Sequence, residues 1–152
     1  MKVFVLEKET LIQAGPAIVW DFFSSPHNLA QITPPYMRFR IKSCPSAKEI
    51  YNGMLIRYRV SPLAGIPLGW VTEIKDIKKG SRFTDVQQHG PFALWEHTHI
   101  FEAAGNDVLM TDRVRYALPL GLLGVWARKL FVKRQLEEIF EYRDARIREI
   151  FS

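Results

Sequence analysis

The sequence predicts an α+β protein in which one curved antiparallel sheet is covered by a long C-terminal helix. Between residues 36 and 116, apolar and polar residues alternate in short runs separated by Gly, Pro and Asn, which is typical of an antiparallel meander. Residues 125–152 contain no Gly or Pro and repeat apolar residues at helical spacing, which indicates one long amphipathic helix. Only this helix is long enough to cover the apolar face of the sheet.

The chain is expected to begin with one strand and two short helices. Residues 2–13 are rich in Val, Phe and Ile and predict the strand. A Gly-Pro pair interrupts it, and Pro is favoured at the first position of a helix, so a short helix is expected over 16–24. A second short helix over 27–32 should end at the Pro pair 34–35, which stops regular structure.

Six further strands follow, giving a sheet of about seven. They are expected at 36–42, 54–60, 69–77, 82–89, 94–101 and 108–116. The segment 61–68 carries two prolines and a glycine and is expected to be a loop beside a pocket mouth. The Arg and Lys residues that alternate with apolar ones should form an ordinary solvated face, and a patch for an anionic surface is the alternative.

Turn chemistry fixes the pairing of the last two strands. If residues 105–106 (Gly-Asn) form a two-residue turn, antiparallel pairing places His99 opposite Asp112 and Trp95 opposite Tyr116. This set is aromatic and apolar with His and Asp inside it, whereas the other face is charged. We therefore expect it on the concave face, under the C-terminal helix.

The preceding hairpin decides where Asp85 points. A three-residue connection at the Gly90-Pro91 turn places Asp85 opposite His97, whereas a two-residue turn would send it outward. We favour the three-residue connection because it keeps the concave face consistent along both hairpins. That face then gathers two imidazoles and two carboxylates: Asp85, His97, His99 and Asp112.

These four side chains are the main candidates for chemistry. His97 and His99 lie on one strand face, roughly 7 Å apart at a rise of ~3.3 Å per residue. Two His–Asp pairs suit hydrogen bonding to a carbonyl ligand or acid–base catalysis. The alternatives are a structural cluster whose members satisfy one another, or a metal site. No metal is expected, because the His-x-His pattern supplies only two neutral ligands. A neighbouring carboxylate should raise the imidazole pKa unless burial dominates.

One cation and four aromatic residues complete the candidate set. Arg143 lies on the apolar stripe of the last helix, so it needs an internal acidic partner or a ligand carboxylate, or its head group extends from the rim. Trp70, Trp95, Tyr58 and Tyr116 are expected either in the core or in a pocket wall.

Several sequence segments resemble a known superfamily. The segments GPFALWEHTHIF and TDRVRYALP, followed by a terminal helix with FEYRDARI, resemble the SRPBCC superfamily of START-like, birch-pollen-allergen-like and polyketide cyclase/dehydratase-type proteins. AQITPP and LGWVTEI are similar to its bacterial ligand-binding branch. The resemblance covers nearly the whole chain and implies a single helix-grip domain over 1–152 with a cavity between sheet and helix. The superfamily has no universal catalytic residue, so none is transferred.

Composition excludes several classes of protein. The single cysteine, Cys44, permits no internal disulfide and no cysteine-based zinc site. No apolar run approaches the roughly 20 residues of a membrane span, and the N-terminus lacks the features of a secretory signal, so a cytoplasmic location is expected. The net charge is +5, but the basic residues are scattered and no nucleic-acid-binding motif is present, so no nucleic-acid partner is expected.

The sequence therefore predicts a non-enzymatic protein that binds a small hydrophobic or amphipathic molecule in an internal cavity, without a cofactor. The alternatives are a cyclase or dehydratase that uses a His–Asp pair on a carbonyl compound, and an interaction domain whose interior is filled. The oligomeric state is left open. The expected cavity residues are Trp70, Asp85, Trp95, His97, His99, Asp112, Tyr116 and Arg143.

Overall fold

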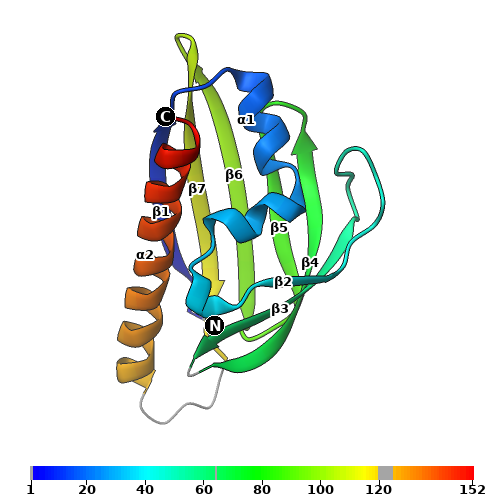
Figure 1. Ribbon diagram of the computed structural model, residues 1–152. Helices are drawn as coiled ribbons and strands as arrows, with labels where there is room; N and C mark the ends of the chain where they lie inside the picture. The colour runs from blue at the N-terminus through cyan, green and yellow to red at the C-terminus, as the bar shows by residue number, and fades with distance from the viewer. Residues whose placement is uncertain (1, 64, 120–124) are drawn as a thin grey trace.

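The computed structural model describes residues 2–63, 65–119 and 125–152 and has the predicted α+β architecture (Figure 1). Within these ranges, seven strands form one antiparallel sheet in the order β1-β7-β6-β5-β4-β3-β2. The elements in chain order are β1 (Phe4–Ile12), α1 (Pro16–Phe23), the 3₁₀ helices η1 (Pro26–Ile32) and η2 (Pro35–Met37), β2 (Arg40–Ser43), β3 (Leu55–Leu63), β4 (Ile66–Lys78), β5 (Arg82–His89), β6 (Leu94–Ala104), β7 (Asp107–Ala117) and α2 (Val125–Ile150).

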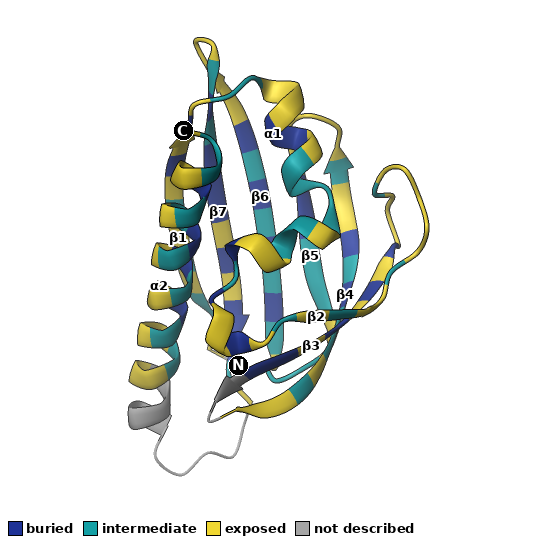
Figure 2. Ribbon diagram, in the orientation of Figure 1, coloured by how far each residue is buried: buried dark blue, intermediate teal, exposed yellow. Residues whose placement is uncertain are grey.

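The helices all lie on the concave face of the sheet. Figure 1 shows α2 running beside β1 and β7 along one side of the sheet, while α1 and η1 cross the same face next to the C-terminal half of α2. The alternating burial along β6 and β7 in Figure 2 agrees with strands that have one solvent face and one core face. This arrangement confirms the helix-grip fold.

Two groups of buried side chains fill the space under the helices. One lies beneath α1 and contains Val19, Trp20 and Met110. The other lies beneath α2 and contains Val114 and Phe140. The sheet is long enough to carry both, and the candidate site lies where they meet.

The observed register confirms the pairing that turn chemistry predicts. His99 lies opposite Asp112 and Trp95 opposite Tyr116. Asp85 lies opposite His97, as the three-residue connection requires. The tight turn works because its glycine has φ 64°, in the left-handed region that side chains other than Gly rarely adopt.

Two expected boundaries are wrong. Residues 36–42 do not form one strand, because Pro35 begins the 3₁₀ turn η2 and Arg38 ends it with φ 47°, so β2 begins only at Arg40. The segment 61–68 is not an open loop either. Strands β3 and β4 continue until Leu63 pairs with Ile66, and the pairing shifts register just before this point, where the ladder tolerates a proline.

The outward face of the sheet has the charge pattern of an ordinary solvated surface. Arg113 donates to Glu7 at 2.8 Å, and Arg115 donates to Glu96. All four side chains are at least partly exposed, so these pairs contribute little to stability. Among the described residues, no helix has both the length and the apolar character needed to cross a membrane.

Candidate ligand-binding site

A cavity of about 620 Å³ lies between the concave face of the sheet, η1 and α2. Its size falls within the range of pockets that bind small molecules, about 300–1,000 Å³. Its walls are largely apolar and include Leu29 of η1, Val60 of β3, and Leu136 and Phe140 of α2. The interior is therefore not filled by side chains, as the interaction-domain alternative would require.

Aromatic rings form one wall of the cavity. Trp70 of β4 and Trp95 of β6 meet edge to face with centroids 5.3 Å apart, and Phe92 packs against both. Tyr116, which the sequence offered as a further wall residue, is not among the lining side chains. It packs against Phe4 and Phe92 in the core beneath α2.

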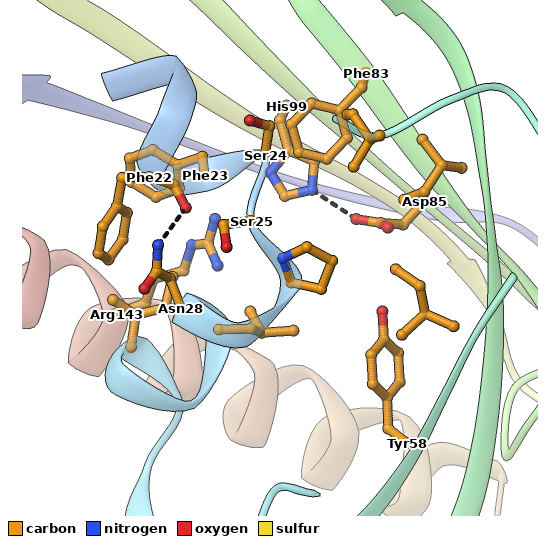
Figure 3. Close-up of a pocket in the computed structure, with 16 residues that line it drawn as sticks. Phe22, Phe23, Ser24, Ser25, Asn28, Tyr58, Phe83, Asp85, His99 and Arg143 are labelled. Atoms are coloured by element: carbon orange, nitrogen blue, oxygen red, sulfur yellow. Dashed lines mark hydrogen bonds and ion pairs between the residues drawn. The ribbon is translucent and has the colours of Figure 1, made fainter. Parts of the chain in front are cut away.

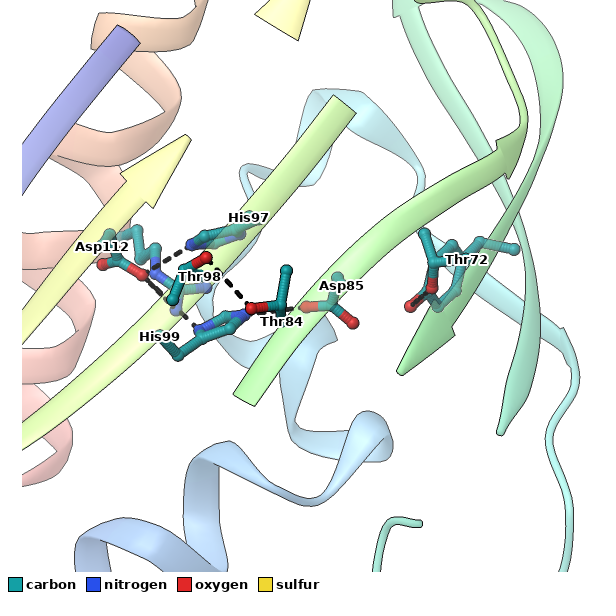
Figure 4. Close-up of polar contacts among 9 residues, drawn as sticks. Thr72, Thr84, Asp85, His97, Thr98, His99 and Asp112 are labelled. Carbon is teal, nitrogen blue, oxygen red and sulfur yellow. Dashed lines mark hydrogen bonds and ion pairs between the residues drawn. The ribbon is translucent and has the colours of Figure 1, made fainter. Parts of the chain in front are cut away.

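At the boundary between the two core groups lies a set of five side chains that we call the polar cluster: Asp85, His97, His99, Asp112 and Arg143. Figure 4 shows the four residues that come from the strands. His97 Nε2 lies 2.7 Å from Asp112 Oδ1, and His99 Nε2 lies 2.8 Å from Asp85 Oδ2. The hydrogen bonds thus run diagonally across the sheet, although the directly opposed pairs are His99–Asp112 and His97–Asp85.

The two imidazole rings are closer than strand spacing predicts. Their centroids lie 3.9 Å apart and the rings are stacked, whereas an upright arrangement gives about 7 Å. Phe83 stacks on the far side of His99 at 4.3 Å. The rings of Phe83, His99 and His97 therefore form one continuous stack on the concave face. In this stack, each imidazole lies within hydrogen-bonding distance of a carboxylate on a neighbouring strand.

Arg143 connects α2 to this group. Its guanidinium donates from Nη2 to Asp112 Oδ1 at 3.2 Å, and the residue is only 5% exposed. The sequence left open whether this arginine pairs with an internal carboxylate, binds a ligand carboxylate or extends from the rim. In the structure it pairs with the internal carboxylate of Asp112. Asp112 itself does not line the cavity; it lies behind His97 and Arg143, with which it bonds.

Burial and charge set the ionisation of the cluster. Burial alone would raise the pKa of Asp112, but the Arg143 guanidinium and the hydrogen bond from His97 outweigh it, so that pKa lies well below its usual range. Burial, helped by the adjacent His99, lowers the pKa of His97 to about 4, although the bond to Asp112 opposes the shift. Burial therefore outweighs the neighbouring carboxylate at His97, which is the exception that the sequence-based expectation allowed.

At neutral pH His97 is consequently an uncharged ring next to an ionised Asp112. Its Nε2–H donates to that carboxylate, so Nδ1 carries the lone pair. No other side chain or backbone group in the described part of the chain forms a hydrogen bond with this Nδ1. Because His97 lines the cavity, its ring can accept a hydrogen bond there.

A smaller pocket of about 40 Å³ adjoins the cluster beneath α1 and η1 (Figure 3). Asp85, His99 and Arg143 line both this pocket and the larger cavity. Tyr58 also borders both, and its hydroxyl lies 2.9 Å from that of Thr72. The polar cluster thus stands between a large apolar space and a small one.

The cluster is better suited to hydrogen bonding than to a metal. Asp85, His97 and His99 each offer one potential ligand atom, all within 4.8 Å of one another. However, each histidine Nε2 is already hydrogen-bonded to a carboxylate. The Arg143 guanidinium also lies beside the group, and its positive charge opposes a cation. We assign no metal to these residues.

Several lining residues were not anticipated from the sequence. Leu29 and Ile32 enter from η1, and Val132, Gln135 and Ile139 enter from α2. The only available signal was the apolar stripe of the last helix, which was interpreted as core. An apolar stripe predicts which side of a helix faces the interior, but it does not predict where the surrounding elements enclose a cavity.

Comparison with known proteins supports the fold. No family model and no curated protein sequence matches the chain. Among solved structures, a START superfamily protein from Mycobacterium smegmatis is 18% identical, with 96% of this chain and 98% of that one covered and a TM-score of 0.68. The Zhui aromatase/cyclase from Streptomyces sp. R1128 is 13% identical, with 96% and 92% covered and a TM-score of 0.75.

A ginseng major latex-like protein from Panax ginseng is 14% identical, with 98% and 97% covered and a TM-score of 0.66. These likenesses extend over nearly the full length of every chain compared. The protein therefore shares the helix-grip fold of these structures, which confirms the fold that the sequence resemblance implies.

Proposed function

We propose that the protein binds a small, largely apolar molecule in the cavity between the sheet and α2. The observation that carries this proposal is a cavity of about 620 Å³ with aromatic and aliphatic walls and one buried polar cluster. Apolar walls supply affinity, at roughly 25 cal/mol for each Å² removed from water, while a few fixed polar groups orient the ligand. Ligand contacts by Trp70, Asp85, Trp95, His97, His99 and Arg143 are part of this proposal.

Acid–base catalysis on a carbonyl compound is less well supported. A general base works best when its pKa lies near the operating pH. The pKa of His97 is instead lowered to about 4, which makes it a weak base at neutral pH. We therefore favour binding over a cyclase or dehydratase activity, and assign His97 the role of a hydrogen-bond acceptor.

The proposal can be tested by fluorescence titration with N-phenyl-1-naphthylamine, an uncharged apolar probe. The test variant is Val132→Trp, because Val132 is half-buried on α2 and lines the cavity, so a larger ring there occupies part of the space. The matched control is Lys133→Trp, which adds the same ring at the next, exposed position of the helix.

We expect saturable binding to the wild type and to Lys133→Trp, and binding weakened at least about tenfold in Val132→Trp. Circular dichroism checks that both variants are folded. Equal affinity in all three proteins would place the probe outside the cavity and overturn the proposal. Native mass spectrometry of the purified wild-type protein then identifies any molecule that co-purifies.

A further inference from the structure

Three groups of the polar cluster have unused hydrogen-bonding capacity that a ligand can reach. Arg143 uses Nη2 on Asp112, and its Nη1 bonds to no group in the described ranges. Asp85 accepts from His99 through Oδ2, and within the same ranges nothing donates to its Oδ1. His97 Nδ1 is the third such atom. All three residues line the cavity, and Figure 3 shows Arg143 and Asp85 on different walls of the adjoining pocket.

The chemistry of these groups is complementary. Arg143 only donates, so it requires an acceptor oxygen on the ligand. Asp85 and the Nδ1 of His97 only accept, so they require a donor such as a hydroxyl group. A ligand that displaces water from these groups must offer an acceptor to the donor and donors to the acceptors, because a buried polar group left without a partner destabilises the complex.

The charges of the cluster favour an uncharged ligand. The cluster contains two carboxylates, Asp85 and Asp112, but only one guanidinium, and that guanidinium is already paired with Asp112. Among the side chains that the structure describes, no other Lys, Arg, Asp or Glu lines the cavity. A ligand carboxylate would therefore add a negative charge close to Asp85 in a setting of low dielectric, and none of the described lining residues offers a free cation to balance it.

We infer that the cavity selects uncharged molecules that carry a carbonyl-type oxygen and a hydroxyl group near one end of an otherwise apolar skeleton. This inference rests on the proposed function and specifies its ligand class. The carbonyl oxygen accepts from Arg143, the hydroxyl donates to Asp85 or His97, and the apolar part lies against Trp70 and Trp95. Carboxylates of the same shape are disfavoured.

Three naphthalene compounds test this pattern by isothermal titration calorimetry at neutral pH. The first is a hydroxynaphthamide with its hydroxyl meta to the amide, which supplies both groups without charge. The second is the corresponding hydroxynaphthoate, which has the same shape but is anionic. The third is the naphthamide without the hydroxyl. We expect the hydroxynaphthamide to bind about tenfold or more tightly than the hydroxynaphthoate, and several-fold more tightly than the naphthamide.

The variant Asp85→Asn tests the source of the charge selection. It removes one carboxylate at nearly constant shape, so the hydroxynaphthoate should gain about fivefold or more in affinity while the naphthamide changes little. The control is Glu7→Gln, which removes the same charge from the exposed outer face of the sheet and should alter no affinity. If Asp85→Asn does not fold, the three affinities of the wild type still decide the question.

The possible results distinguish a wrong ligand class from a wrong proposal about the cavity. If the hydroxynaphthoate binds the wild type as tightly as the hydroxynaphthamide, or if none of the three binds although N-phenyl-1-naphthylamine does, the inference is overturned and the cavity proposal stands. If the compounds bind but Val132→Trp affects none of them, they lie elsewhere, and the inference fails together with the proposed function.

Discussion

The neutral state of buried His97 predicts a measurable loss of stability in mild acid. Its pKa is 6.5 in an unfolded chain and about 4 in the folded protein. Between these values the unfolded chain binds a proton that the folded protein refuses, so the free energy of unfolding falls as the pH decreases. From pH 7 to pH 5 this difference removes about 2 kcal/mol, and most of the loss occurs below pH 6.5.

The assay is urea unfolding at pH 7 and pH 5 for the wild type and His97→Gln, which retains an amide donor for Asp112 but cannot titrate. Other groups titrate in both proteins, so the difference between the two pH-dependent losses isolates His97. We expect the wild type to lose about 2 kcal/mol more than the variant. His89→Gln, at an exposed position, is the control and should behave like the wild type.

Parallel losses in the wild type and in His97→Gln would refute this reasoning, because they would mean that His97 accepts its proton equally easily in both states. An NMR titration of the wild-type ring provides an independent measurement if the variant is poorly folded. The ring signals of His97 should show an uncharged imidazole at pH 5. A midpoint near the ordinary value would contradict the burial argument directly.

Three further substitutions test the fold, each measured by thermal and urea unfolding. Ile147→Ala should destabilise by about 2–5 kcal/mol because Ile147, on the inward face of α2, is 1% exposed. Arg148→Ala, in an exposed ion pair one residue later, should change stability by less than about 1 kcal/mol, and equal effects would contradict the packing of α2. Asp112→Asn should cost about 3–5 kcal/mol because it leaves the buried Arg143 without a carboxylate, and a neutral result would mean that the pair is solvated. Gly105→Ala should cost about 1–2 kcal/mol at φ 64°, and no loss would argue against the tight turn.

The sheet was predictable where turn chemistry and alternation agreed. Residues 105–106 demanded a two-residue turn, and that turn determined every pairing between β6 and β7. In 36–42 the alternation was present, but Pro35 and the left-handed Arg38 placed a 3₁₀ turn there instead. Local backbone chemistry thus overrode a regular side-chain pattern, which a count of apolar positions alone does not reveal.

The candidate site was predictable in its members more than in its geometry. Register placed Asp85, His97, His99 and Asp112 on one face, but register alone does not specify which carboxylate each imidazole meets. The two imidazoles also stack on each other and on Phe83, and register does not specify this packing of side chains either. The gap lined by η1 and α2 likewise depends on how separate elements are placed, and no local pattern encodes it.

The polar cluster connects α2 to the sheet and also fixes the positions of polar groups beside the cavity. A single carboxylate oxygen, Asp112 Oδ1, accepts from His97 of β6 and from Arg143 of α2, so it joins two strands to the helix that covers them. These bonds hold the imidazole and the guanidinium in position before any ligand arrives. For the ligand that we propose, these donors and acceptors would already be ordered, and preorganisation of this kind reduces the entropy lost on binding. Within the cluster, the Arg143–Asp112 pair connects α2 to the sheet beside the cavity.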